Sequence, residues 1–130
     1  MFSITNQFLL NESKLISDGY PLKIKLSIIG EAQNLVGNFG GTYFLQEDTR
    51  NNKHYWIHQS GGKAIWWDNT SPPSWMVGRS EDLGSSRAGI LGPSNNDSPP
   101  NQITSNSWQY GKDGSFHDTI DVHFEDWTFK

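Results

Sequence analysis

The sequence predicts an all-β fold in one domain spanning residues 1–130, either an antiparallel β-sandwich or a flattened barrel with one long loop. Aromatic residues make up 13% of the chain although its hydrophobic total is only 34%, so much of the core must be built from rings. Thirteen glycines, six prolines and many Asn and Ser imply frequent turns, which suit short strands better than helices. A chain of this length can bury a core without disulfides.

The clearest strand signal lies at residues 22–28. Four aliphatic residues alternate there with Lys23, Lys25 and Ser27, which is the period of two expected for a strand with one buried face. The Asp18-Gly19 pair before it predicts a turn. We expect residues 1–20 to form an extended segment at the edge of the sheet.

A meander of short strands is predicted next. Residues 41–46 and 54–59 have strand composition, and the polar stretch between them has the character of a hairpin loop. The "QSGG" turn then leads into a strand at residues 63–68. After a loop stiffened by two prolines, residues 75–79 form the next strand.

Residues 80–107 have a different character, because they are dense in Gly, Ser, Asn and Pro and show no sustained period. A loop of this length inside a compact domain is usually functional or disordered. Within it, "AGIL" is predicted to pack back as a short strand or anchor. Two strands follow, at residues 108–114 and 118–130, and the second places Ile120, Val122 and Phe124 on one face.

Composition and charge exclude several classes of function. The net charge is −4 and no cluster of Lys and Arg is present, so nucleic acid is not an expected partner. No apolar run approaches the ~20 residues that a membrane-spanning helix needs. The absence of cysteine excludes thiol catalysis and zinc–thiolate sites, and no cofactor is predicted. The first residues lack a signal-peptide pattern, which favours the cytoplasm without fixing the compartment.

From about residue 28 onward, the order of motifs resembles a known module. A Gly-x-Tyr strand, an Asn-rich hairpin, an aromatic "IWW" strand and a "WMVG" strand follow one another. This order is similar to that of a small, cysteine-free, Gly- and Trp-rich β module found in multidomain and uncharacterised eukaryotic proteins. The resemblance implies a non-catalytic binding or interaction module and supplies no catalytic residues. The residues that carry it are Gly41, Tyr43, Tyr55, Ile65, Trp67, Trp75 and Gly78.

The adjacent tryptophans Trp66 and Trp67 suggest a binding surface. Neighbouring residues of a strand point to opposite faces, so we expect Trp67 in the core with Ile65, and Trp66 exposed beside Trp56 and His58. An exposed indole can stack on a sugar ring while amides and carboxylates bind its hydroxyls. The predicted ligand-binding residues are Trp56, His58, Trp66, Asp68, Asn69, Arg79, Asn95, Asn96 and Asp97.

An alternative is that the second face is covered too, by another sheet or by the long loop, so that each of these tryptophans belongs to the core. The amide-rich part of the long loop, which contains Asn95, Asn96 and Asp97, has two interpretations as well. Loops on a rigid β scaffold often form recognition surfaces, and this one could form a wall of a cleft. It could also be a solvated loop limited by Pro and by Asx turns.

The expected function is therefore non-catalytic recognition of a glycan, as in a lectin. A protein ligand or a homo-oligomer interface, using the same aromatic patch, is the alternative. A small hydrolase using Asp68 with Glu81 or Asp121 is the third possibility. Asp121, His123 and Glu125 share one strand face and could bind a metal ion, although the ordinary polar side of a strand is the simpler interpretation.

Overall fold

A computed structural model describes residues 20–70 and 72–126 and contains one antiparallel sheet of nine strands. One α-helix lies between the first two strands, and four 3₁₀ turns lie in the connections. The strands are β1 (Lys23–Ile28), β2 (Gly41–Arg50), β3 (Lys53–His58), β4 (Lys63–Asp68), β5 (Ser74–Arg79), β6 (Ile90–Leu91), β7 (Trp108–Lys112), β8 (Ser115–Thr119) and β9 (Val122–Asp126). The helix is α2 (Gly30–Val36), and the 3₁₀ turns are η1 (Gly37–Phe39), η2 (Ser80–Asp82), η3 (Pro100–Gln102) and η4 (Ser105–Ser107).

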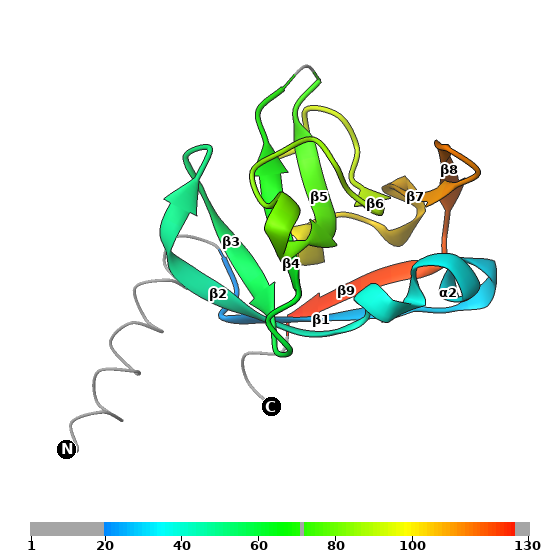
Figure 1. Ribbon diagram of the computed structural model, residues 1–130, viewed down its shortest axis with the longest axis horizontal. Coiled ribbons are helices and arrows are strands. Elements are labelled where there is room, and N and C mark those ends of the chain that lie inside the picture. The colour runs from blue at the N-terminus through cyan, green and yellow to red at the C-terminus, as the bar shows by residue number, and fades with distance from the viewer. Residues whose placement is uncertain (1–19, 71, 127–130) are drawn as a thin grey trace.

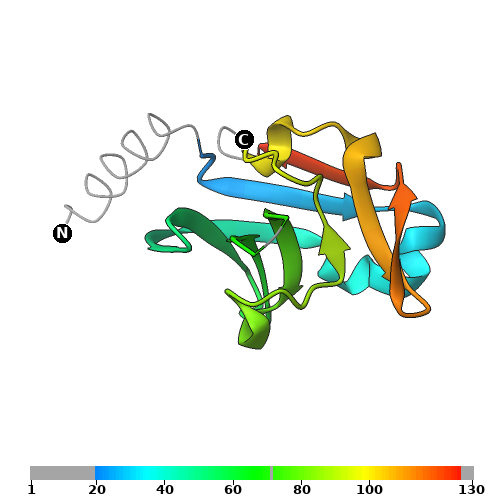
Figure 2. The same ribbon diagram turned by 90° about the horizontal axis from the view of Figure 1, so that it is seen from above.

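The sheet curls into a nearly closed barrel (Figures 1 and 2). Each strand from β1 to β7 pairs with the next one along the chain, and β9 returns to pair with β1. The all-β fold predicted from the sequence is thus confirmed, as a barrel. Of the predicted edge segment, residues 1–19 lie outside the described residues.

Strand β1 has the alternating burial that its sequence predicts. Ile24, Leu26 and Ile28 are buried, while Lys23, Lys25 and Ser27 are half-exposed. The strand pairs with β2 on one side and with β9 on the other, so both of its backbone edges are hydrogen-bonded. Its apolar face joins the interior cluster of the barrel, which includes Tyr43, Trp56, Ile65, Trp67, Trp75, Val77, Ile90, Trp108 and Val122.

Strands β4 and β5 are buried on both faces. A second apolar cluster, made of Tyr55, Ala64, Trp66 and Met76, lies outside the barrel wall. Leu83, Ala88 and Leu91 pack against this cluster, and the Trp66 indole N–H donates to the Ser85 carbonyl at 2.9 Å. The segment after β5 therefore covers the outer face, as one of the two alternatives predicted. Within this segment Ile90 and Leu91 form the predicted short strand.

The register of the β3–β4 hairpin overturns the predicted exposure of Trp56. Trp56 pairs with Ile65 and Ile57 pairs with Ala64, so four residues separate the facing positions His58 and Lys63. With this register Trp56 shares the interior face with Ile65, and Tyr55 joins Trp66 outside. A slip of one residue exchanges the faces of a strand, so the predicted placement of Trp56 on the same face as Trp66 was off by one residue.

Helix α2 was not predicted as an element. Ala32 and Val36 are four residues apart and both buried, so one side of this short helix packs on the barrel. Gly30 begins the helix with a φ of +60°, a conformation that glycine adopts without steric cost. The helix lies beside the ends of β1 and β9 and next to β7 (Figure 1).

The predicted strand at residues 118–130 is instead interrupted. β8 ends at Thr119, and β9 begins at Val122 on the far side of the sheet order. At the corner the Asp121 N–H donates to the Thr119 hydroxyl, and the Asp121 carbonyl accepts from the Ile29 N–H. Ile120 consequently lies outside the core with 67% of its surface exposed, whereas Val122 is buried as predicted.

Candidate functional site

Neither tryptophan proposed for ligand stacking is accessible. Trp56 and Trp66 have no exposed surface, and both indole N–H groups already have partners. Trp56 donates to the Pro21 carbonyl at 2.9 Å, just as Trp66 donates to that of Ser85. The predicted stacking surface is therefore wrong, because the outer face of β4 is covered. Trp67, predicted as a core residue, is indeed buried.

His58 and Arg79 lie where β3 and β5 end, away from the amide-rich loop. The His58 ring is bound on both sides by its own chain: Nε2 lies 3.0 Å from the Gly40 carbonyl, and Nδ1 accepts from the Ser60 N–H. The Arg79 guanidinium pairs with Glu81 and Asp82 at 3.3 and 3.2 Å. Both side chains therefore stabilise local structure.

The remaining predicted residues gather at the opposite ends of the strands. Asp68 is buried, and its carboxylate accepts from the Thr70 hydroxyl and N–H. The loop carrying Asn95, Asn96 and Asp97 reaches this end too, because the Asn95 N–H donates to the Pro73 carbonyl. Asp97 also pairs with Lys53 at 3.3 Å. Exposed Asn69 completes a polar rim, defined here as Asn51, Lys53, Asn69, Asn95, Asn96 and Asp97.

The proposed metal ligands do not gather into a site. His123 and Glu125 lie on β9 opposite Ser27 and Lys25, while Asp121 lies at the corner before that strand. Across residues 20–70 and 72–126, no group of three or more His, Asp or Glu side chains is arranged to bind a metal ion.

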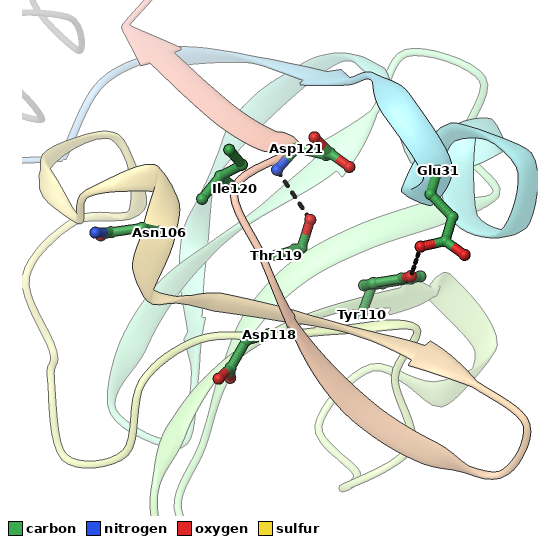
Figure 3. Close-up of a pocket in the computed structure, with 7 residues that line it drawn as sticks. All are labelled: Glu31, Asn106, Tyr110, Asp118, Thr119, Ile120 and Asp121. Carbon is green, nitrogen blue, oxygen red and sulfur yellow. Dashed lines mark hydrogen bonds between the residues drawn. The ribbon is translucent and has the colours of Figure 1, made fainter.

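A different set of residues forms a cavity of about 360 Å³ at the corner between β8 and β9 (Figure 3). The walls come from the start of α2, from β7, from the end of β8 and from η4. We call this cavity the corner pocket; its lining residues are Glu31, Asn106, Tyr110, Asp118, Thr119, Ile120 and Asp121.

Glu31 fixes one wall of the corner pocket. Its carboxylate accepts from the Tyr110 hydroxyl at 3.1 Å and from the Lys112 ammonium at 2.8 Å. The Lys112 hydrogen bond is the main cause that lowers the pKa of Glu31, followed by the Tyr110 hydrogen bond. Glu31 is thus held as a carboxylate that can only accept hydrogen bonds. The same contacts tie α2 to β7.

The other polar groups of the corner pocket are also positioned by their neighbours. Asp118 accepts from the Gln109 side chain at 2.9 Å, and the Asn106 carbonyl oxygen accepts from the Thr104 hydroxyl at 2.9 Å. The Asp121 carboxylate lies so close to Gly30 that a Cβ there would stand 2.6 Å from Oδ2. The pocket therefore offers fixed acceptors and one amide donor beside the exposed Ile120 side chain.

Sequence reasoning named Asp121 of this pocket as a possible metal ligand and as a possible hydrolase carboxylate, but named no residue of the pocket as a sugar-binding residue. Glu31 was missed because it lies on an unpredicted helix, and Ile120 because it was assigned to the core face of a strand. The acidic stretch "HDTIDVHFED" was the one available signal. Chemically, the pocket can bind hydroxyl or amine donors through carboxylate oxygens.

No protein-family model, curated protein or solved structure matches this chain. Among the described residues, no helix has both the length and the apolar character needed to cross a membrane.

Proposed function

We propose that the protein is a non-catalytic recognition domain and that it binds a carbohydrate in the corner pocket. One observation carries the proposal: the pocket combines carboxylates, an amide and a hydroxyl with an exposed aliphatic side chain. A sugar presents the complementary features, because its hydroxyls donate and accept hydrogen bonds and its ring carbons form small apolar faces. The corner pocket is open to solvent and has a volume of about 360 Å³, which is large enough for a small ligand.

The lowered pKa of Glu31 suits this residue to accept hydrogen bonds from a ligand and not to donate a proton. A glycosidase needs one carboxylic acid with a raised pKa as its proton donor. Glu31 has a lowered pKa because Lys112 and Tyr110 donate to it, so it suits the role of a permanent acceptor. The anchoring of the pocket by β7, β8 and α2 also supports recognition, since preorganised groups lose little entropy on binding.

The test is calorimetric or NMR titration of the protein with a panel of monosaccharides and disaccharides. We expect Asn106→Ala and Asp121→Asn to weaken sugar binding about fivefold or more, since each removes a hydrogen bond to the ligand or weakens one. Asn69→Ala on the polar rim is the matched control and should leave the affinity unchanged. If no sugar binds, or if Asn69→Ala alone abolishes binding, the proposal fails.

A further inference from the structure

Among residues 20–70 and 72–126, no strand pairs with the second backbone edge of β8. β8 is the last strand of the sheet order and pairs with β7. Four of its five residues are exposed and Thr119 is half-exposed. A free strand edge presents a row of hydrogen-bonding groups that can pair with another extended chain.

The turn before β8 identifies which groups point outward. Asp113 and Gly114 have φ values of +55° and +83°, as a two-residue type I′ hairpin turn requires. In such a hairpin the flanking pair Lys112–Ser115 exchanges both hydrogen bonds, and the pattern repeats at every second pair. The N–H and C=O groups of Phe116 and Asp118 therefore point away from β7.

The surface beside this edge has both apolar and acidic parts. Phe116 is 38% exposed and Leu35 of α2 is 50% exposed, and both line a hollow of about 430 Å³ with Ala88. The acidic part contains Asp118 and Asp121, which lie at and beyond the other end of β8, and Glu31, which binds Tyr110 and Lys112 of β7. The ammonium of nearby Lys112 is already bound to Glu31 at 2.8 Å.

We propose that β8 is a docking edge for an extended segment of a partner protein that carries Lys or Arg among apolar residues. The segment adds a strand beside β8, with hydrogen bonds to the backbone of Phe116 and Asp118. An apolar side chain enters the hollow beside Leu35, and basic side chains lie near the carboxylates. This docking goes beyond the proposed sugar binding and does not depend on it.

A labelled peptide Lys-Val-Lys-Val-Lys-Val tests the docking edge by fluorescence anisotropy, with Glu-Val-Glu-Val-Glu-Val as the control. We expect the basic peptide to bind and its affinity to fall as salt rises, while the acidic peptide does not bind. Amide exchange measured by NMR should show new protection at Phe116 and Asp118 on binding. Equal binding of both peptides, binding of neither, or protection elsewhere would overturn the proposal.

Phe116→Pro provides the decisive variant, because proline removes an N–H that points outward and leaves the hydrogen bonds to β7 in place. We expect it to weaken peptide binding about fivefold to tenfold and to leave sugar binding unchanged. Asp118→Asn, which retains the backbone and side-chain shape, separates the charge contribution and should reduce the salt dependence. Light scattering tests whether a second copy of this chain occupies the edge instead. If the wild type is a dimer and Phe116→Pro converts it to a monomer, the edge binds a second copy and the peptide proposal is overturned.

Discussion

Trp56 contributes to stability through both its volume and its one polar group. The ring lies inside the barrel in edge contact with Trp75, at a centroid distance of 5.6 Å, and its N–H satisfies the Pro21 carbonyl. Trp66 likewise contributes a large buried ring and a hydrogen-bonded N–H, but outside the barrel wall, where its ring lies over Gly78. A Cβ on Gly78 would stand 2.9 Å from the Trp66 ring, so glycine at this position permits the close cover.

These contacts predict that Trp56→Ala and Trp66→Ala each lower the free energy of unfolding by about 3–5 kcal/mol, through loss of packing and formation of a cavity. Trp56→Phe should cost less, about 1–3 kcal/mol, because it mainly leaves the Pro21 carbonyl without its donor. Urea denaturation followed by circular dichroism measures each change. Phe44→Ala is the control, since Phe44 is 41% exposed; equal losses for Phe44→Ala and Trp56→Ala would contradict the assigned burial.

At the scale of elements, the Glu31–Lys112 ion pair adds to the apolar packing and to the Tyr110–Glu31 hydrogen bond that attach helix α2 to the barrel. The pKa of Glu31 is lowered from its ordinary value of 4.5, chiefly by the Lys112 hydrogen bond. A carboxyl with a lowered folded-state pKa stabilises the protein above its unfolded-state pKa, and this contribution is lost as the pH falls through the folded-state value.

We therefore expect Glu31→Gln to be slightly less stable than the wild type at pH 7, and the difference to disappear as the pH falls through the lowered pKa of Glu31. Thermal unfolding of both proteins between pH 7 and pH 3 measures this. Glu125→Gln, at another exposed carboxylate, is the control for a general effect of charge. A difference between Glu31→Gln and the wild type that persists unchanged at pH 3 would show that the ion pair is not its source.

The strands could be predicted because alternation at β1, aromatic composition at β3 to β5, and turn residues between them are local signals. The inward face of β3 could not be predicted, because its register against β4 depends on how many residues the "QSGG" connection leaves unpaired. The corner pocket could not be predicted from the sequence either, because its residues are distant in the chain. Glu31 and Tyr110 lie 79 positions apart in the chain, and they meet only because α2 packs against β7.

For the whole molecule, burial on both faces predicts a gradient of local stability. β4 and β5 lie in the middle of the sheet between two apolar clusters, whereas β8 lies at its end with exposed side chains. Amide exchange in the native protein should be slowest in β4 and β5 and fastest in β8. Mass spectrometry of exchanged peptides measures this order. Equal protection of β8 and β5 in the unliganded monomer would contradict the free edge.

The return of β9 to β1 also determines the order in which the molecule can be assembled. The pairs from β2 to β5 join strands linked by short turns, so they can form as soon as the second strand is available. The pairing of Lys25 with Glu125 instead joins residues 100 positions apart in the chain, and such contacts form slowly. During synthesis, the backbone groups on one edge of β1 therefore stay unpaired until β9 has been made. Substitutions that slow the pairing of β9 with β1 would prolong the lifetime of the partly folded sheet, whose unpaired edge is prone to aggregation. This holds even where the folded barrel tolerates the substitution.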